Sequence, residues 1–338
     1  MRITIMGAGC IGGLIGGALE ASGTPVTFVD RGAHLAALRE DGLRVTRAGG
    51  GELHVTPLRA VADTASLGAQ DVVFLALKAH QISAAIDDIA ALIGSDTIVV
   101  TLQNGIPWWY FQRHGGEHDG RIIEGADPGG RIAARIDPAR IVGCIAYPAV
   151  SKVAPGHILH VEGHRFPVGA LDGSESAETL RVSVLLESAG FKSPVLPDIR
   201  AEIWLKAIGN MSFNPISALT QATLVDICEH PDACALARRM MQEGEAVAAA
   251  LGVSLRVSID RRIEGARRVG KHRSSMLQDV ENGEPLELEA LVTAVAELGE
   301  LTGTQTPATH DVIALARLLN HVIIGERVAI VRKPRNGA

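Results

Sequence analysis

The sequence predicts an α/β protein whose N-terminal Rossmann-type, doubly wound parallel sheet is followed by an all-helical C-terminal domain. A GxGxxG segment stands between a predicted strand and a predicted helix near the N-terminus, and strands alternate with helices as far as Pro197. The length of 338 residues suggests two domains, because one domain usually takes ~150 residues. We therefore expect a Rossmann domain over residues 1–197, a helical domain over residues 198–325 and a basic tail over residues 326–338.

Composition excludes several classes of protein. An apolar fraction of 47% argues against a disordered chain, and a net charge of −6 argues against a nucleic-acid-binding surface. No apolar run reaches the ~18 residues that a membrane-spanning helix needs. The four cysteines form no CxxC motif, which suits a reducing compartment. We expect a cytoplasmic protein with no nucleic-acid or membrane partner.

The glycine-rich segment has the features of a dinucleotide-binding loop. It consists of Gly7, Ala8, Gly9, Cys10, Ile11 and Gly12. Gly7 permits a tight turn, Gly9 lets the backbone approach a pyrophosphate, and Gly12 lets the helix pack closely against the strand. Cys10 and Ile11 lie in the same loop and are expected at the cofactor, Cys10 as a small filler rather than a nucleophile. A bound anion would be stabilised by the N-terminus of the helix that follows.

The end of the second predicted strand bears on the choice of cofactor. Asp30 lies eighteen residues after Gly12 in the sequence. An acidic residue at about this spacing typically binds the ribose 2′-hydroxyl of NAD. Arg31 follows directly and could pair with the 2′-phosphate of NADP. The two neighbours favour different cofactors, so NAD and NADP both stay open. We expect NADH to bind at least as well as NADPH, since a carboxylate repels the 2′-phosphate.

Polar residues follow two of the predicted buried strands. Lys78 ends an apolar strand over residues 71–77, and Asn104 follows another over residues 97–102. Ligands of parallel sheets bind beyond the carboxyl ends of the strands, so we expect both residues at the edge of the cofactor site. The alternative is that each residue merely caps a strand or turns a loop.

The helical half contains an unusual polar stripe. We expect a helix over residues 201–214 that ends at Pro215, because proline disfavours helical geometry in the residue before it. Lys206, Asn210 and Asn214 recur every four residues and share one face of this otherwise apolar helix. A bound oxo acid would supply hydrogen-bond partners for the three side chains. The alternative is a polar face exposed to solvent.

A second polar cluster follows near residues 274–279. Ser275 has no evident histidine and aspartate partners, which argues against acyl transfer. Pro285 is typical of a first helical turn, and Glu287 is expected in that same turn, where the helix dipole stabilises a carboxylate. An ordinary charged first turn is the alternative for Glu287. No metal site is expected, since the histidines of residues 157–164 fall in a strand-like stretch that turns His157 and His160 to opposite faces.

Six motifs in this order resemble those of the ketopantoate reductase (2-dehydropantoate 2-reductase) family over nearly the whole chain. They are GAGCIGG from Gly7, LALKAHQ from Leu75, QNG from Gln103, EIWLKAIGNMSFNP from Glu202, SSMLQD from Ser274 and TPAT from Thr306. The resemblance implies NAD(P)H-dependent reduction of a 2-oxo acid, 2-dehydropantoate to pantoate in pantothenate biosynthesis, in the cleft between the two domains. The last motif is expected to open the last long helix.

The resemblance also implies roles for individual residues. Lys206 would be the catalytic lysine and proton donor, and Glu287 the carboxylate that completes the site. Lys78 would lie near the nicotinamide ribose. The residues implied to hold substrate are Asn104, Asn210, Asn214 and Ser275.

Two departures from the family pattern fall near the substrate end. Residues 287–293 read ELEALVT and lack the Asn-Gly pair that commonly closes the family's motif. Residues 108–138 form a long segment with the aromatic run Trp108–Phe111 and a glycine-rich stretch, where the family usually has a short helix. We expect Trp108 or Trp109 to line the pocket and the stretch to form a movable lid; packing into a core or a subunit contact is the alternative.

Other functions therefore stay open beside the first. One is a reductase or 2-hydroxy acid dehydrogenase on the same scaffold that acts on a bulkier or more apolar substrate. Another is a non-catalytic protein that senses dinucleotides. Retention of the lysine, the asparagines and Glu287 together argues against a sensor. The oligomeric state is open, with a homodimer through the helical domain as one alternative.

Overall fold

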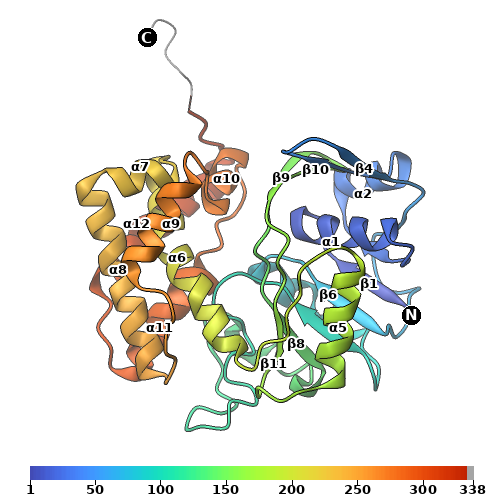
Figure 1. Cartoon of the computed structure of the whole chain (residues 1–338), viewed down its shortest axis with the longest axis horizontal. Helices are drawn as coiled ribbons and strands as arrows, with labels where there is room; N and C mark the ends of the chain where they lie inside the picture. Colours follow the sequence, from blue (N-terminus) through green and yellow to red (C-terminus); the bar gives the residue numbers. More distant parts are fainter. Residues whose placement is uncertain (333–338) are drawn as a thin grey trace, which may run out of the picture. The chain divides into compact units, whose positions relative to one another are not determined.

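The computed structural model describes residues 1–332, so Lys333 and Arg335 of the predicted basic tail lie outside the described residues. By its internal contacts the chain divides into two compact units (Figure 1). Unit 1 comprises Met1–Asn104, Trp108–Ile122 and Asp127–Ile199. Unit 2 comprises Gly105–Pro107, Ile123–Ala126 and the described residues from Arg200 onward.

Unit 1 carries all the strands of the described residues. Its strands are β1 (Ile3–Met6), β2 (Thr27–Val29), β3 (Leu43–Arg47), β4 (Glu52–Val55), β5 (Arg59–Val61), β6 (Val72–Leu75), β7 (Ile98–Thr101), β8 (Ile141–Cys144), β9 (Ala149–Ala154), β10 (His157–Glu162) and β11 (Val168–Ala170). Its helices are α1 (Cys10–Ala21), α2 (Gly32–Glu40), α3 (Ala79–Ile82), α4 (Ile86–Ala90) and α5 (Ala177–Ser188), with 3-10 turns η1 (Ser83–Ala85), η2 (Pro128–Gly130) and η3 (Pro138–Arg140).

The main sheet has the predicted Rossmann-type topology. Its seven strands run in the order β11-β8-β7-β6-β1-β2-β5, and all neighbours pair in parallel except the edge strand β11. Strands β6 and β7 are buried along their whole length, as expected for a parallel sheet covered on both faces. The chain leaves β1 for β2 on one side and returns to β6 on the other, which is the switch point where such sheets bind ligands. The predicted fold class is confirmed.

A second sheet was not predicted from the sequence. Its four strands run in the order β4-β3-β10-β9, and β10 pairs in parallel with β3 although more than a hundred residues separate them. The strand-like stretch that follows Gly156 is therefore divided: β10 belongs to the small sheet and β11 to the edge of the main sheet.

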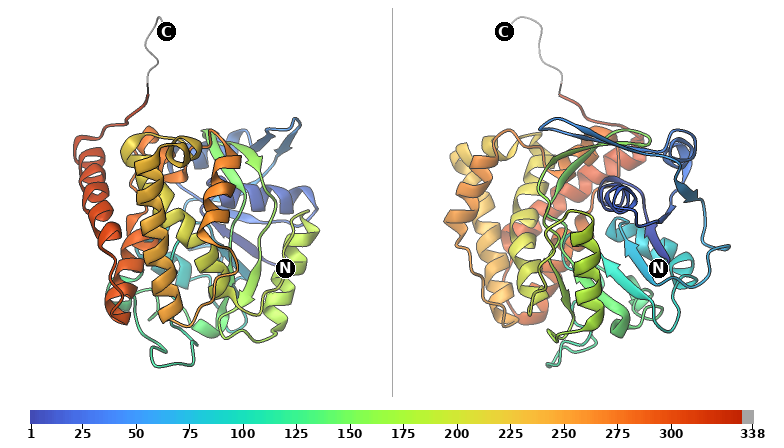
Figure 2. Two further views of the ribbon diagram at one scale, coloured as in Figure 1. Left: turned by 60° about the vertical axis from the view of Figure 1, so that its left-hand side comes forward. Right: turned by 45° about the vertical axis from the view of Figure 1, so that its right-hand side comes forward.

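Helix α1 is packed between the two sheets, which explains its glycines. A Cβ atom on Gly16 would lie 2.4 Å from the Phe28 ring in the main sheet, and one on Gly17 would lie 2.9 Å from Leu43 in the small sheet. The right-hand view of Figure 2 shows α1 end-on with strands on both sides. Only glycine allows so close an approach on two faces of one helix.

The aromatic run of residues 108–111 is part of the core of unit 1. All four rings are at most 2% exposed. The indole N–H of Trp109 donates a hydrogen bond to Thr101 Oγ1 at 2.9 Å, and a Cβ atom on Gly143 would lie 2.9 Å from its ring. The hypothesis that Trp109 lines a pocket is therefore wrong, and the core-packing alternative holds for it. Thr101 on β7 accepts the indole N–H, and Gly143 on β8 leaves room for the ring.

The glycine-rich stretch after the aromatic run is held by a buried carboxylate. Asp127 is 0% exposed, and its two oxygens accept the N–H groups of Ile132 and Ala133 at 2.8 and 2.9 Å. These hydrogen bonds order the segment that the sequence suggested as a lid. The sequence did not single out Asp127.

The regular elements of unit 2, among its described residues, are all helices. Its helices are α6 (Ile199–Thr220), α7 (Leu224–Glu229), α8 (Pro231–Ala250), α9 (Ile259–Val269), α10 (Ser275–Asn282), the π-helix η4 (Glu289–Thr293), α11 (Ala294–Thr302) and α12 (Pro307–Glu326). Helix α6 takes its first residue from unit 1. Among residues 1–332, no helix combines the length and the apolar character that crossing a membrane requires.

Helix α6 does not end where the sequence predicts. It continues through Pro215 to Thr220, so the expected stop at Pro215 is wrong. Proline removes the N–H that would bond to the carbonyl of Met211, which ordinarily costs a helix ~3 kcal/mol. Every residue from Met211 to Ala218 is buried. Packing on all sides therefore outweighs the lost hydrogen bond.

The last long helix opens as predicted at the TPAT motif. Thr306 is the N-cap and Pro307 the first helical residue of α12. Glu243 on α8 accepts the N–H groups of Ala308 and Thr309 at 2.8 and 2.9 Å. A carboxylate is favoured here because it meets unpaired N–H groups and the positive end of the helix dipole.

Candidate functional site

The glycine-rich loop has an open side and a closed side. Gly7 turns the chain at φ +91°, and Gly9 is the N-cap of α1 with no side chain capping it. A Cβ atom on Gly12 would lie 1.9 Å from the Gly7 carbonyl oxygen, whereas one on Gly9 would meet nothing within 4 Å. Gly12 therefore serves packing, and Gly9 leaves space beside the start of α1, as a pyrophosphate would require.

Asp30 is turned toward this loop. Its Oδ2 accepts the N–H of Ala8 at 2.7 Å, and its Oδ1 accepts the N–H of Arg31 at 2.7 Å. The side chain of Arg31 is 74% exposed and forms an ion pair with Asp88 at 3.1 Å. Both oxygens of the predicted ribose-binding carboxylate thus have donors within the protein, while the Arg31 guanidinium extends into solvent.

Lys78 and Asn104 lie at the same edge of the main sheet. Each follows one of the paired parallel strands β6 and β7, and both residues are half-buried. Gln103 links the two strand ends, because its Nε2 donates to the carbonyl oxygens of Leu75 and Leu77 at 2.7 and 3.1 Å. Sequence reasoning quoted Gln103 only as part of a motif; its place directly after a buried strand was the available signal.

Helix α6 presents the predicted polar stripe in unit 2. Lys206 and Asn210 are half-buried, and Asn214 is 6% exposed. The Nδ2 of Asn214 donates to Ser275 Oγ at 3.5 Å, which is a long hydrogen bond. The structure therefore brings together Asn214 and Ser275, two residues from different predicted motifs.

Ser274 and Ser275 have different roles at the start of α10. Ser274 is the N-cap, and its Oγ accepts the N–H of Leu277 at 3.1 Å. Ser274 is buried, whereas Ser275 is exposed. Capping by Ser274 leaves the hydroxyl of Ser275 available to Asn214 or to a ligand.

Glu287 lies before its helix rather than in its first turn, which corrects the prediction. Residues 284–287 have no regular secondary structure, and the helix begins at Leu288 and passes at once into the π-helix η4. Pro285 therefore belongs to the connection after Gly283. Glu287 is half-buried at the point where this connection enters the helix.

The π-helix coincides with a contact from a distant part of the chain. The carbonyl of Ala290 accepts the N–H of Ile106 at 2.8 Å, and a Cβ atom on Gly105 would lie 2.3 Å from the same oxygen. A π-turn contains an extra residue and is often found at functional sites. Here a main-chain carbonyl of the helix binds the segment Gly105–Pro107, which directly follows Asn104.

Glu297 on α11 holds the other segment that belongs to unit 2. Its two oxygens accept the N–H groups of Glu124 and Gly125, each at 2.8 Å. No local pattern predicts this contact, because the partners are more than 170 residues apart.

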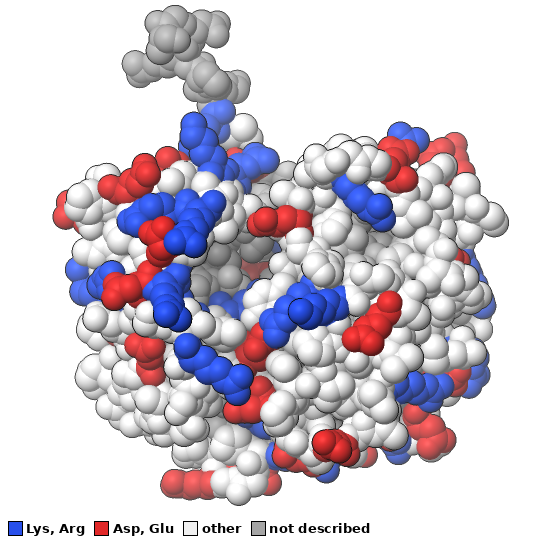
Figure 3. Space-filling model, viewed as in Figure 1, with Lys and Arg blue, Asp and Glu red and all other residues white. Residues whose placement is uncertain are grey.

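Several basic residues of unit 2 form ion pairs with acidic side chains. Lys and Arg side chains gather over α9 and the chain that leads to α10 (Figure 3). Arg267 and Arg268 both contact Glu264, and Arg273 contacts Glu281. Hydrogen bonds from Arg268 and Arg267 hold the pKa of the Glu264 carboxyl below its ordinary value.

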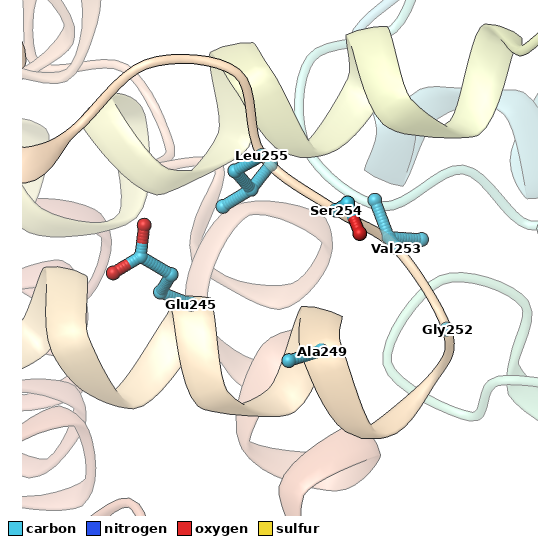
Figure 4. A pocket seen from close by; sticks show the side chains of 6 residues that line it. All are labelled: Glu245, Ala249, Gly252, Val253, Ser254 and Leu255. Carbon is cyan, nitrogen blue, oxygen red and sulfur yellow. The ribbon is translucent and has the colours of Figure 1, made fainter.

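An open pocket elsewhere in unit 2 contains none of the predicted site residues. It is lined by Glu245, Ala249, Gly252, Val253, Ser254 and Leu255, at the end of α8 and in the chain that follows (Figure 4). The described residues also contain no group of three histidine, cysteine or acidic side chains that could hold a metal ion.

A dinucleotide loop at the switch point of a parallel sheet and a lysine on a half-buried polar stripe define the class: a dinucleotide-dependent oxidoreductase. Family models described as "Ketopantoate reductase PanE/ApbA" and "Ketopantoate reductase PanE/ApbA C terminal" match residues 3–108 and 198–320. The chain belongs to the ketopantoate reductase family. The resemblance predicted from the motifs and the predicted enzyme class are thus confirmed.

Named relatives span nearly the whole chain. A 2-dehydropantoate 2-reductase of Mesorhizobium japonicum is 50% identical, covering 94% of this chain and 98% of the relative. One from Archaeoglobus fulgidus is 30% identical, covering 94% and 97%. The crystal structure of a putative ketopantoate reductase from Ralstonia solanacearum is similar with a TM-score of 0.90 at 38% identity, covering 95% of this chain and 98% of that one.

Proposed function

We propose that this protein reduces 2-dehydropantoate to pantoate with NADPH. The observation that carries the proposal is the stripe on α6, where a lysine and two amides share one face of a buried helix and Asn214 meets Ser275. The name of the 50% identical relative supports the same substrate. The buried position of Trp109 removes this residue, though not Trp108, as support for a bulkier or more apolar substrate.

The glycine-rich loop fits a dinucleotide. Gly9 leaves open space beside an uncapped helix N-terminus, and the N–H groups of Cys10, Ile11 and Gly12 form the first turn of α1. Lys78 and Asn104 would hold the nicotinamide end, since both follow strands next to β1 and β6 at the switch point. When bound, the reduced cofactor supplies a hydride to the keto carbon.

The geometry of Asp30 supports NADPH rather than NADH. Its oxygens already accept the N–H groups of Ala8 and Arg31, so the carboxylate is less available to a ribose hydroxyl. The exposed guanidinium of Arg31 can instead pair with a 2′-phosphate. Its ion pair with Asp88 is exposed and therefore weak enough to be exchanged. This preference is opposite to the one expected from the sequence.

The residues of unit 2 would bind and protonate the substrate. The Lys206 ammonium stabilises negative charge on the carbonyl oxygen and donates the proton that completes the alcohol. Asn210, Asn214 and Ser275 bind the carboxylate and hydroxyl groups of the substrate. Glu287 keeps the ammonium oriented or accepts a substrate hydroxyl. A homodimer through unit 2 remains a prediction, which sedimentation would test.

Steady-state kinetics of the wild-type protein test the proposal. We expect the highest kcat/KM for 2-dehydropantoate with NADPH in a panel that also contains pyruvate, 2-oxoisovalerate and phenylpyruvate, each with both cofactors. A higher kcat/KM for phenylpyruvate would favour the bulkier-substrate alternative, and a preference for NADH would restore Asp30 as the ribose ligand. If the protein binds a cofactor but oxidises it with none of the 2-oxo acids, a dinucleotide sensor would be favoured.

A further inference from the structure

His34 links the glycine-rich loop to the small sheet. It lies in the first turn of α2 and is half-buried. Its Nε2 contacts the carbonyl oxygen of Ala8 at 2.8 Å, and its Nδ1 contacts the backbone nitrogen of Gly156 at 3.0 Å. One imidazole ring therefore bridges the loop and the turn between β9 and β10.

These partners determine the tautomer of the ring. The backbone N–H of Gly156 can only donate, so Nδ1 must accept and carries no proton. The proton of the neutral ring is then on Nε2, which donates to the Ala8 carbonyl. A protonated ring would place an N–H on Nδ1 opposite the N–H of Gly156 and lose that hydrogen bond. The bridge is complete only with a neutral imidazole.

On the loop side, His34 completes a clamp around a single residue. Ala8 donates its N–H to Asp30 Oδ2 at 2.7 Å and accepts the His34 hydrogen bond with its carbonyl oxygen. Ala8 lies between Gly7, which turns the chain at φ +91°, and Gly9, which leaves the open space. The two polar side chains thus fix both peptide groups that flank Ala8 in a loop made otherwise of flexible glycines.

On the other side, the anchor is rigid. Gly156 has a φ of +71°, and its carbonyl oxygen accepts the N–H of Arg44 on β3 at 2.8 Å. A Cβ atom there would lie 3.0 Å from Ala37 on α2. The turn is therefore pressed against the helix that carries His34, and a shift of the ring would be transmitted to the loop.

We propose that His34 is a positioning residue that presets the glycine-rich loop for the dinucleotide, so that cofactor affinity depends on its hydrogen bond to the Ala8 carbonyl. The inference rests on the proposed function, since it assumes that the loop binds NAD(P)H.

Two substitutions separate the halves of the bridge. In His34→Gln the amide nitrogen can occupy the Nε2 position and keep the donor to Ala8. In His34→Asn the amide oxygen can occupy the Nδ1 position and accept from Gly156, but the side chain is too short to reach Ala8. His54→Gln is the matched control, because the His54 Nε2 also contacts a backbone carbonyl, that of Asp41, away from the loop.

Cofactor affinity of the folded variants is measured by nicotinamide fluorescence in neutral buffer, with NADH titrated beside NADPH. We expect His34→Asn to raise the Kd for both cofactors roughly five- to tenfold, as for one lost hydrogen bond. We expect His34→Gln, which keeps the donor to Ala8, and the control His54→Gln to bind both cofactors as the wild type does.

The same measurements contain the results that would overturn the inference. If His34→Asn binds the cofactors as tightly as the wild type does, the clamp on Ala8 has no effect on affinity. If His34→Gln binds them as weakly as His34→Asn does, the hydrogen bond to Ala8 is not the source of the loss. A wild-type protein that binds neither cofactor would remove the proposed function and this inference with it, whereas normal wild-type binding with unaffected variants overturns this inference alone.

Discussion

Lys206 illustrates how a single residue can be tested apart from the fold. It is half-buried on α6, one helical turn before Asn210, and lies in a different unit from the glycine-rich loop. We expect Lys206→Ala to lower kcat by roughly 10²–10⁴-fold, the usual contribution of a positioned proton donor. Its Kd for NADPH should not change. The control is Lys152→Ala, because Lys152 on β9 is exposed. An unchanged kcat in Lys206→Ala would show that Lys206 takes no part in the mechanism.

Trp109 tests whether the aromatic run is structural. Its ring is 1% exposed, and its N–H is bonded to Thr101. We expect Trp109→Ala to lower the free energy of unfolding by about 3–5 kcal/mol, because it leaves a cavity and an unpaired hydroxyl. The ratio of kcat/KM values across the substrate panel should stay constant.

Chemical denaturation measures the effect of the Trp109 substitution. Leu315→Ala on α12 is the control, since Leu315 is 57% exposed and its removal should change stability by less than about 0.5 kcal/mol. If Trp109→Ala changed the substrate preference without lowering stability, that result would support the hypothesis that Trp109 lines the pocket.

At the scale of elements, α1 shows two different uses of one residue type. Gly12, Gly16 and Gly17 allow the helix to approach two sheets at once, whereas Gly9 meets nothing within 4 Å. The GxGxxG pattern is the same for both uses, so only the packing distinguishes a structural glycine from a binding one.

This difference predicts opposite effects for two similar substitutions. Gly12→Ala places a methyl group 1.9 Å from a carbonyl oxygen, and we expect a large loss of thermal stability. Gly9 has a φ of −62°, which any residue can adopt, so Gly9→Ala should fold normally. We expect its Kd for NADPH to rise roughly tenfold or more, because the methyl group enters the space left for the pyrophosphate.

Thermal unfolding and cofactor titration of the same two variants measure both quantities. Normal affinity in Gly9→Ala would contradict the assignment of the loop. Normal stability in Gly12→Ala would contradict the packing of α1 against β1 and β6.

The π-helix is an element whose form depends on a partner. The apolar spacing after Glu287 predicts a regular helix, and the chain indeed turns helical at Leu288. The wider turn occurs where Ala290 binds Ile106 and where Glu297, a little further on, binds residues 124 and 125. The spacing of apolar residues along this helix does not indicate which distant residues it contacts.

At the scale of the whole molecule, both units carry carboxylates that favour the folded state above acidic pH. A backbone hydrogen bond from Arg2 lowers the pKa of Asp71 in unit 1. The hydroxyl and N–H of Thr223 lower the pKa of Asp226 in unit 2. A carboxyl whose pKa is lower in the folded state stabilises the protein above its unfolded pKa and loses that contribution as the pH falls through the folded value.

We therefore expect stability to decline as the pH falls below about 4, the ordinary range of aspartate. Asp226→Asn should be less stable than the wild type at neutral pH and should lose less stability on acidification, because one titrating carboxylate is gone. Urea midpoints at about pH 7 and about pH 3 measure both changes. Asp311→Asn on the exposed side of α12 is the control, and an acid response of Asp226→Asn equal to the wild type would refute the role of Asp226.

Much of the fold and part of the candidate site followed from the sequence. The glycine spacing, the two buried strands before Lys78 and Asn104, and the four-residue repeat of Lys206, Asn210 and Asn214 are local patterns. Each depends on backbone geometry within one turn, one strand or one helix, and a short stretch of residues is enough to specify that geometry. The family followed from the order of such motifs along the chain.

Contacts between distant residues were decided only by the tertiary structure. Strand β10 pairs with β3, and Pro215 stays helical because its surroundings are buried. Asp30 turns to Ala8, and Trp109 enters the core instead of a pocket. In each case a local preference competes with packing or with a hydrogen bond from a remote segment. The identity of that segment is a property of the folded chain, because burial and pairing depend on which surfaces the whole fold brings together.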